Sequence, residues 1–209
     1  MKAMRWVSRL KGALARGVFP HELSFFLDLP WRRVVLSPDK LVARLALPAS
    51  SHVLEVGSGS GFYSVAVALS LSAGRLELLD LQPEMLKKAR RKIEAQGLSN
   101  VGYTLAEAGL LPFRAETFDA LFLVAVLGEV TNQKAFLSEA RRVLKPLGTL
   151  SISEHLPDPD FSPAAKVKSL VENEGFELFA HHGAKWSYTL NFKKSDRRQA
   201  SSATTRRAH

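Results

Sequence analysis

A glycine-rich segment has the residue types and spacing that most clearly predict binding chemistry in this chain. Its sequence is Glu55-Val56-Gly57-Ser58-Gly59-Ser60-Gly61, in which three glycines alternate and an acid stands two residues before the first. Glycine permits a tight turn and lets backbone N–H groups approach a ligand closely. The segment lies between an expected strand and an expected helix, where the positive helix N-terminus favours a ligand. A tight strand–helix turn without a ligand is the alternative interpretation.

The glycine spacing and a later acid narrow the kind of ligand. A dinucleotide-binding fingerprint has glycine at its first, third and sixth positions, whereas Phe62 occupies the sixth position here. Asp80 follows 19 residues after Gly61, at the end of the next expected strand. Its carboxylate can there accept hydrogen bonds from both hydroxyls of a ribose. A surface acid ahead of the helix that begins at Pro83 is the alternative for Asp80.

Four stretches of the chain together resemble the type-11 branch of the class I S-adenosylmethionine-dependent methyltransferases. The resemblance extends from about Phe19 to Lys193, and the combination of motifs is more specific than any one of them. The motifs are the glycine-rich segment, Leu79–Leu86, Glu107–Phe113 with Phe118-Asp119, and Arg142–Gly148. The resemblance implies S-adenosylmethionine as the cofactor and S-adenosylhomocysteine as its product.

The resemblance also implies a role for each matching residue. Glu55 would orient the methionine amino group, directly or through water, and Asp80 would bind the ribose hydroxyls. Leu81 would pack against adenine. Glu107 would receive the adenine amino group, and the Ala108 N–H would reach a ring nitrogen. The implied cofactor-binding set is Glu55, Gly57, Ser58, Gly59, Gly61, Asp80, Leu81, Glu107, Ala108 and Val124.

The chain departs from the family at two places. The segment Leu123–Leu127 would run beneath the sulfonium, and just beyond it many relatives carry two histidines where this chain has Gly128 and Glu129. Histidine-based proton removal is therefore in doubt, and Glu129 becomes a candidate for contacting the substrate. A surface acid that leads a helix is the equal alternative. Leu147 replaces the first of two family glycines, which affects a turn and not the cofactor site.

Other candidates for contacting the acceptor follow expected strand ends, where open α/β sheets bind ligands: Glu154, His155, His181 and His182. Of all these residues, Glu129 and His155 are the predicted catalytic pair, and a structural or surface histidine is the alternative for His155. Asp158 and Asp160 suggest a metal ligand set, but two prolines within residues 155–160 favour a plain surface turn. No metal site is therefore expected.

The predicted function is methyl transfer to a small-molecule or lipid-like acceptor by in-line displacement. The protein then mainly aligns the acceptor and excludes water, so the lack of a catalytic triad does not argue against an enzyme. No Asn/Asp-Pro-Pro-aromatic element follows the fourth expected strand, which disfavours methylation of a flipped nucleobase. The nearest specific resemblance is to quinone-type C-methyltransferases. The alternatives are a noncatalytic module that binds the same cofactor and an NAD-binding oxidoreductase.

The elements that must position these residues alternate along the chain. Short apolar strands followed by helices predict an α/β, Rossmann-like fold with helices on both faces. We expect a seven-stranded, mostly parallel sheet, with an antiparallel C-terminal strand because residues 181–185 are too few for a helical crossover. The expected strands are 52–56, 75–80, 101–105, 119–126, 149–154, 176–180 and 186–193. The expected helices are 39–47, with Ser37 as N-cap, 61–72, 83–96, 132–144 and 163–174.

The net charge of +9 is concentrated at the two ends of the chain. Residues 1–20 carry five bases and no acid, and residues 193–209 carry six bases and one acid. Solvated termini are the simpler interpretation. The alternative is electrostatic docking to an acidic surface, either a membrane, through weak peripheral contact of the basic N-terminal segment, or nucleic acid, which is the less expected partner. The oligomeric state stays open.

Three regions follow from these patterns. Residues 1–47 are a predicted helical arm or lid, residues 48–193 the S-adenosylmethionine-binding domain, and residues 194–209 a basic disordered tail. Aromatic residues of the arm and the C-terminal strands would cap an apolar acceptor or simply pack against the sheet: Phe25, Phe26, Trp31 and Trp186. Cysteine is absent, which fits a reducing compartment, and a cytoplasmic protein is expected.

Overall fold

Seven strands form one sheet in the computed structural model, which describes residues 35–195. The sheet order is β3-β2-β1-β4-β5-β7-β6. All neighbours from β3 to β5 pair in parallel, whereas β7 pairs antiparallel with both β5 and β6. The strands are β1 (His52–Val56), β2 (Arg75–Asp80), β3 (Val101–Leu105), β4 (Phe118–Val124), β5 (Leu144–His155), β6 (Phe176–Ala184) and β7 (Ser187–Lys194). The predicted fold class is confirmed.

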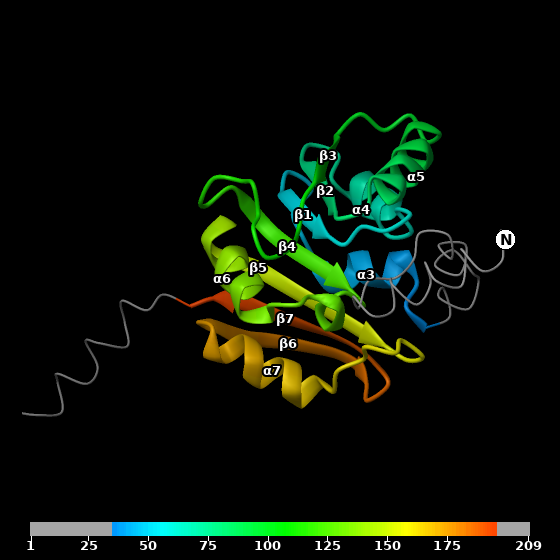
Figure 1. Ribbon diagram of the computed structural model, residues 1–209. Coiled ribbons are helices and arrows are strands. Elements are labelled where there is room, and N and C mark those ends of the chain that lie inside the picture. The colour runs from blue at the N-terminus through cyan, green and yellow to red at the C-terminus, as the bar shows by residue number, and fades with distance from the viewer. Residues whose placement is uncertain (1–34, 196–209) are drawn as a thin grey trace, which may run out of the picture.

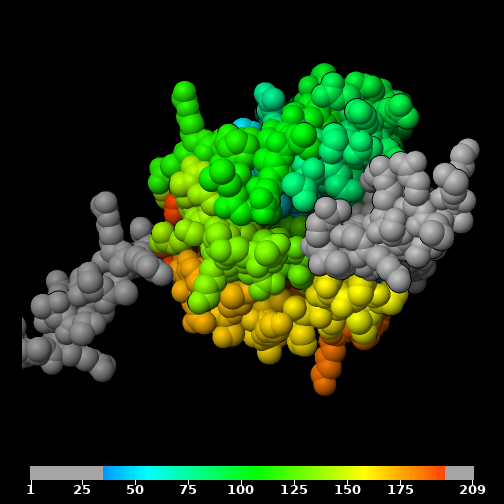
Figure 2. Space-filling model, in the orientation of Figure 1, coloured from blue at the N-terminus to red at the C-terminus, as the bar shows by residue number. Residues whose placement is uncertain are grey.

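Helices cover the sheet on both faces. They are α3 (Pro38–Leu45), α4 (Ser64–Ser70), α5 (Pro83–Glu94), α6 (Gln133–Val143) and α7 (Ala164–Asn173), with a short 3₁₀ helix, η2 (Leu127–Glu129). Figure 1 shows α4 and α5 near β1–β3, and α6 and α7 beside the C-terminal strands at the other end of the sheet. In the space-filling view, α6 and α7 hide most of the C-terminal half of the sheet (Figure 2).

Strand alternation divides the core into two apolar clusters. Val53 faces α3, α4 and α5, whereas its neighbour Leu54 faces α6 and α7. Both side chains are fully buried, as expected for a parallel sheet covered on each face. Burying an apolar side chain of this size stabilises the fold by roughly 1.5–3 kcal/mol. The two clusters therefore fix the strands and place their carboxyl ends along one edge.

Some element boundaries differ from the prediction. The helix expected to begin at Gly61 begins at Ser64, because the glycine turn continues through Phe62 and Tyr63 before regular helix is reached. The helix expected to end near Leu47 ends at Leu45, where Ala46 adopts a left-handed conformation with φ of 46°. Its predicted N-cap is confirmed, since the Ser37 side chain accepts a hydrogen bond from the Lys40 N–H.

The C-terminal strands are longer than predicted. β6 extends to Ala184, so His181 and His182 lie within it, and the expectation that they follow a strand end is wrong. β5 begins at Leu144, ahead of the predicted Thr149, and includes Leu147 with φ of 60°. Leu147 thus adopts the left-handed backbone that glycine favours, at a position where the family has glycine.

Several predictions fall on residues 1–34 and 196–209, which lie outside the described part of the chain. These are most of the arm, the tail, both basic termini, and the aromatic residues Phe25, Phe26 and Trp31. Trp186 is described and is 54% exposed in the turn between β6 and β7. Within residues 35–195, no helix is long and apolar enough to cross a membrane.

Candidate active site

The glycine turn after β1 is held at the carboxyl edge of the sheet. Gly57, Gly59 and Gly61 have φ values of 70°, 53° and 79°. The N–H groups of Gly57 and Ser58 donate to the Leu79 carbonyl oxygen at 2.8 and 3.2 Å. A Cβ on Gly57 would lie 2.6 Å from a Val126 methyl carbon, so any larger residue would displace one of the two loops.

The third glycine of the turn serves helix packing. A Cβ on Gly61 would lie 2.9 Å from the Cα of Ala89, so α4 and α5 approach each other through this residue. Lys92 also reaches from α5 to the turn, where its Nζ donates to Ser60 Oγ at 3.2 Å. The turn is therefore fixed by contacts with β2, with the β4–α6 connection and with α5.

Asp80 ends β2 beside this turn and is almost buried. The Gly59 N–H donates to its Oδ2 at 2.8 Å, and the Gln82 N–H donates to its Oδ1 at 2.9 Å. Burial raises the pKa of the Asp80 carboxyl, and hydrogen bonds from backbone N–H groups partly oppose that shift. A carboxylate has about four lone-pair positions, so it can still accept hydrogen bonds from a ligand's hydroxyl groups.

Glu55 is fully buried on β1, next to the same turn. Ser64 Oγ donates to its Oε2 at 2.6 Å. Burial raises the pKa of Glu55 to about 8; the Ser64 hydrogen bond opposes this shift, and the charge of Asp80 adds to it. The Glu55 side chain is therefore mostly neutral at pH 7. A cationic amino group placed beside it would favour the ionised form.

The residues implied for adenine lie on the next strand and the loop that follows it. The Ala106 N–H donates to the Asp80 carbonyl oxygen at 3.2 Å, which ties the end of β3 to β2. Glu107 is exposed and Ala108 is half-buried just beyond this contact. Leu81, on the neighbouring strand end, is 51% exposed. The three side chains thus flank Asp80 at a solvent-accessible edge.

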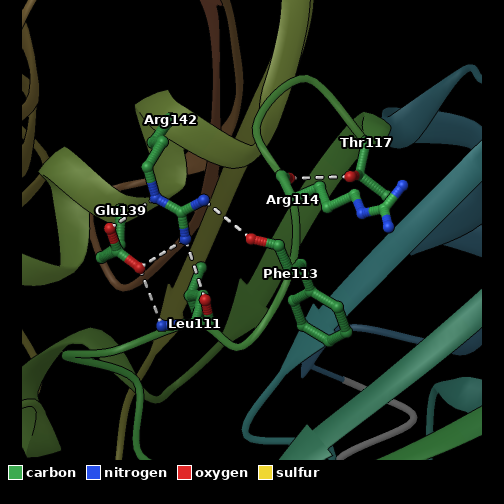
Figure 3. Close-up of polar contacts among 6 residues, drawn as sticks. All are labelled: Leu111, Phe113, Arg114, Thr117, Glu139 and Arg142. Carbon is green, nitrogen blue, oxygen red and sulfur yellow. Dashed lines mark hydrogen bonds and ion pairs between the residues drawn. The ribbon is translucent and has the colours of Figure 1, made fainter.

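An ion pair on α6 holds the loop that carries Glu107 and Ala108 (Figure 3). Arg142 donates to the carbonyl oxygens of Phe113 and Leu111 at 2.7 and 2.9 Å. Its Nε and Nη2 also donate to the two carboxylate oxygens of Glu139, which forms a bidentate ion pair. The Leu111 N–H donates to Glu139 Oε2 at 2.9 Å. The pairing lowers the pKa of Glu139 and raises that of Arg142. Arg142 belongs to one of the motifs that carry the resemblance, but its contacts with the loop could not be predicted from the sequence.

The candidate acceptor residues predicted from the sequence lie beyond the end of β4. Val124 is nearly buried, and Ala125 adopts φ of 54° with its N–H donating to the Ser153 carbonyl oxygen at 2.8 Å. In η2, a Cβ on Gly128 would lie 2.3 Å from the Asp160 carbonyl oxygen. A histidine at this position would therefore clash with the loop after β5.

Acidic side chains converge beside Gly128. Glu154 is 1% exposed at the end of β5. Burial raises its pKa to about 8, and the charges of Asp158, Glu129 and Asp160 raise it further. The structure therefore brings the predicted Glu129 close to Glu154. None of the described residues form a group of three or more side chains that could hold a metal ion.

Two of the predicted histidines, His155 and His181, lie on β5 and β6. His155 is 3% exposed and pairs with Ser187 across the β5–β7 ladder. Successive side chains of a strand point to opposite faces of the sheet, so the His155 and Glu154 side chains lie on different faces. Glu154 lies on the face covered by α7, beside its cross-strand neighbour Tyr188. His181 stacks edge-on to the Tyr188 ring on β6, at 6.2 Å between centroids. The structure thus brings Glu129 close to Glu154, and it joins His181 to Glu154 through Tyr188.

The edge as a whole combines three features suited to a nucleoside-bearing ligand. The glycine turn allows close approach to its backbone, Asp80 can accept hydrogen bonds, and the Ser58 hydroxyl is buried with no hydrogen-bond partner among the described residues. Ligands of open α/β sheets bind beyond the carboxyl ends of the strands. The residues present therefore fit S-adenosylmethionine.

Comparison with known proteins gives a consistent result. Residues 54–152 match a family model described as a methyltransferase domain. The chain is 36% identical to a demethylmenaquinone methyltransferase of Tropheryma whipplei over 132 residues, 63% of this chain and 51% of that protein. It is 34% identical to the ubiquinone/menaquinone biosynthesis C-methyltransferase UbiE of a Marinomonas species over 126 residues, 59% of this chain and 48% of that protein.

The fold has matching solved structures as well. The crystal structure of a SAM-dependent methyltransferase from Aquifex aeolicus superposes with a TM-score of 0.78 at 25% sequence identity, and the match covers 84% of this chain and 99% of that one. The chain spans about half the length of the curated relatives it matches. The similarity to those relatives is therefore a similarity over part of their length.

Proposed function

Because residues 54–152 match the model of a methyltransferase domain family, we propose that the chain transfers the methyl group of S-adenosylmethionine to a small-molecule or lipid-like acceptor. The observation that carries the proposal is the Gly59–Asp80 hydrogen bond, which joins the glycine turn to the acid at the end of β2. The turn supplies the unpartnered Ser58 hydroxyl, and Asp80 supplies acceptors for the ribose hydroxyls.

We assign the residues of the edge to parts of this cofactor. Glu55 faces the amino group of the methionine portion, and Asp80 accepts from the ribose hydroxyls. Glu107 and the Ala108 N–H bind adenine, and Leu81 packs against the ring. When bound, the cofactor would supply a sulfonium-activated methyl group. The acceptor donates the electron pair of the new bond to this methyl carbon, and the electron pair of the broken C–S bond stays on the sulfur. The protein needs mainly to align the acceptor and exclude water.

The acidic group beside Gly128 is the proposed acceptor side. Glu129 contacts the acceptor, and Glu154 receives a proton where the acceptor must lose one. The pKa of Glu154 is about 8, so its carboxyl, like that of Glu55, is mostly protonated at pH 7 and acts as a base through its ionised fraction, which grows as pH rises towards 8. His155 was the other predicted catalytic residue, but its side chain faces away from Glu154, so we place it outside the proton path.

A quinone-type acceptor is the finer proposal. It is supported by the names of the two relatives, which refer to menaquinone and ubiquinone, and by the lack of a nucleobase-methylation motif. Incubation with S-adenosylmethionine labelled in its methyl group, followed by separate extraction of lipid-soluble and water-soluble products, tests this assignment. Label in the water-soluble fraction alone would contradict a lipid-like acceptor.

Cofactor binding is tested first by calorimetry with S-adenosylhomocysteine. We expect Asp80→Asn to weaken binding by about tenfold or more, which corresponds to about 1.4 kcal/mol. Asp39→Asn is the matched control, because Asp39 is an exposed acid in the first turn of α3. Equal affinity of all three proteins, or binding of NAD in place of S-adenosylhomocysteine, would contradict the proposal. Binding without transfer to any acceptor would favour a noncatalytic module.

A further inference from the structure

A small apolar surface lies at the carboxyl edge of the sheet, where β5 ends and β7 begins. It consists of the exposed residues Leu156, Pro157 and Trp186 and is called the apolar corner below. Leu156 and Trp186 are 46% and 54% exposed. The Leu156 N–H donates to the Trp186 carbonyl oxygen at 2.9 Å, so the loop after β5 and the turn between β6 and β7 lie side by side (Figure 1). The two segments therefore present apolar side chains to solvent at one place.

The apolar corner follows the strand pair that carries the proposed acceptor side. Glu154 and Tyr188 are cross-strand neighbours on β5 and β7, and the next pair, His155 and Ser187, is the last of that ladder. Leu156 comes directly after His155, and Trp186 comes directly before Ser187. The corner therefore lies at the end of the ladder, two residues from Glu154 along the chain.

The residue types of the corner are those of a contact with a membrane interface. Neither Leu156 nor Trp186 belongs to the two apolar clusters of the core, so the fold does not depend on their side chains. Tryptophan is enriched at the headgroup level of membranes, because its ring is apolar and its N–H is polar. Lys185, exposed beside Trp186, has an apolar stem and a charged end that can reach the headgroups.

A basic segment of the chain is attached at the same corner. Ser187 Oγ donates to the Val35 carbonyl oxygen at 3.3 Å, so the described chain begins beside the turn between β6 and β7. The sequence that precedes it, residues 1–34, contains seven bases and two acids. Three further acids lie near the corner: Glu129, Asp158 and Asp160. The bases outnumber these five acids, and such an excess of positive charge attracts anionic lipid headgroups.

We propose that the apolar corner docks on an anionic lipid bilayer, with Leu156 and Trp186 at headgroup level and the bases of residues 1–34 against the anionic headgroups. Two weak signals of this kind, a few apolar side chains and a cluster of bases, together give reversible membrane binding. The use of such docking rests on the proposed function. A lipid-like acceptor is dissolved in a bilayer, so it reaches Glu129 and Glu154 most directly when the end of the β5–β7 ladder meets the membrane.

Cosedimentation of the full chain with lipid vesicles tests the proposal. We expect binding to vesicles of mixed phosphatidylglycerol and phosphatidylcholine, and about tenfold weaker binding to phosphatidylcholine alone. Binding to the mixed vesicles should weaken as NaCl rises from about 0.1 to 1 M, because the Debye length falls from about 10 to 3 Å. Trp186→Ser and Leu156→Ser should each weaken it about fivefold or more, since each removes apolar area from the contact. No binding to mixed vesicles, or equal binding to both kinds, overturns the proposal.

Leu69→Ser is the matched control, because Leu69 is a 57% exposed leucine on α4, away from the corner. It should leave vesicle binding unchanged. Equal loss in Leu69→Ser, or full binding by Trp186→Ser, overturns the apolar corner as the membrane contact.

Two further measurements separate this proposal from its alternatives. Light scattering tests whether a second copy of the chain covers the corner: a dimer that Trp186→Ser converts to a monomer overturns membrane docking. Vesicle binding is measured without cofactor or acceptor, and S-adenosylhomocysteine affinity should be the same in all variants. A failure of membrane docking is therefore distinguishable from a failure of the proposed methyl transfer.

Discussion

Gly128 and Asp160 are packed so closely that a Cβ on Gly128 would lie 2.3 Å from the Asp160 carbonyl oxygen. This contact joins the loop after β4 to the loop after β5. The two loops therefore form one wall on the acceptor side, with Glu154 buried behind it. The position of the wall depends on the absence of a side chain at residue 128.

The first prediction concerns this contact. Gly128→Ala forces the two loops apart, because the Asp160 backbone cannot yield as a flexible side chain would. A displacement of about 1 Å near the chemistry can cost on the order of 100-fold in rate. We expect kcat/KM for the acceptor to fall by about 10- to 100-fold, while S-adenosylhomocysteine affinity stays within about twofold. An unchanged kcat/KM would show that the loops do not shape the acceptor site.

The second prediction is that cofactor binding releases a proton through Glu55. The pKa of Glu55 is about 8, so its carboxyl is mostly protonated at pH 7, and a bound ammonium group favours ionisation. Binding should therefore release up to about one proton at pH 7. Calorimetric enthalpies measured in phosphate and in Tris should then differ, and Glu55→Gln should abolish the difference. Equal enthalpies for the wild type in both buffers would rule out this coupling.

The third prediction is that stability falls as pH rises towards 8. Glu55 and Glu154 have folded pKa values of about 8, above the ordinary value of 4.5, so the folded state binds more protons in this window. Their contribution is complete below about pH 4.5 and is lost as pH rises through 8, with a slope of at most about 1.4 kcal/mol per pH unit for each group. Burial lowers the pKa of His52, which opposes the trend below its ordinary value of 6.5.

Urea denaturation at pH 6.5, 7.25 and 8 measures the fall in the free energy of unfolding. This range lies at and above the ordinary pKa of histidine, where the titration of His52 opposes the fall least. Glu55→Gln and Glu154→Gln should each flatten the profile, because each substitution removes one titrating group and keeps the side-chain volume. A profile of unchanged slope in both variants would contradict the raised pKa values.

The fourth prediction concerns the ion pair that holds the loop after β3. Arg142→Met removes the hydrogen bonds to Leu111 and Phe113 and leaves the Glu139 carboxylate with only the Leu111 N–H. Because the pair is partly exposed, we expect a loss of about 1–2 kcal/mol in the free energy of unfolding. S-adenosylhomocysteine affinity should fall as well, since the same loop carries Glu107.

Lys168→Met on α7 is the matched control for that variant. Lys168 forms an exposed ion pair with Glu172 at 3.9 Å, and neither residue contacts a loop of the candidate site. We expect a change of at most about 0.5 kcal/mol in stability and none in cofactor affinity. If Lys168→Met and Arg142→Met weaken binding equally, the loop is not held by Arg142.

The sequence predicted the parallel strands best. The bounds of β1, β2 and β3 match the prediction residue by residue, because each is a short apolar run between turn residues. β6 was predicted too short, since His181, His182 and Gly183 carry no strand signal. These residues are in β6 because β7 pairs with them, which is a tertiary effect that local composition does not contain.

The candidate site divides in a similar way. Glu55, the glycine turn and Asp80 are readable because they lie at strand ends with fixed spacing. The Arg142 contacts were missed because they join residues 29 and 31 positions apart, and no periodicity relates such residues. From the sequence alone, Gly128 is interpreted only as the loss of a histidine that could remove a proton. Its steric role is visible only when the loop containing Asp160 is in place.

The position of β7 between β5 and β6 has a consequence for biosynthesis. β7 follows both strands in the chain yet is inserted between them in the sheet. While Ser187–Lys194 is still inside the ribosome, a nascent chain presents β5 with an unpaired backbone edge, and β6 has no neighbour at all. The C-terminal half of the sheet therefore closes only after Ser187–Lys194 has left the ribosome. Until then its open edge is a target for chaperones and for aggregation.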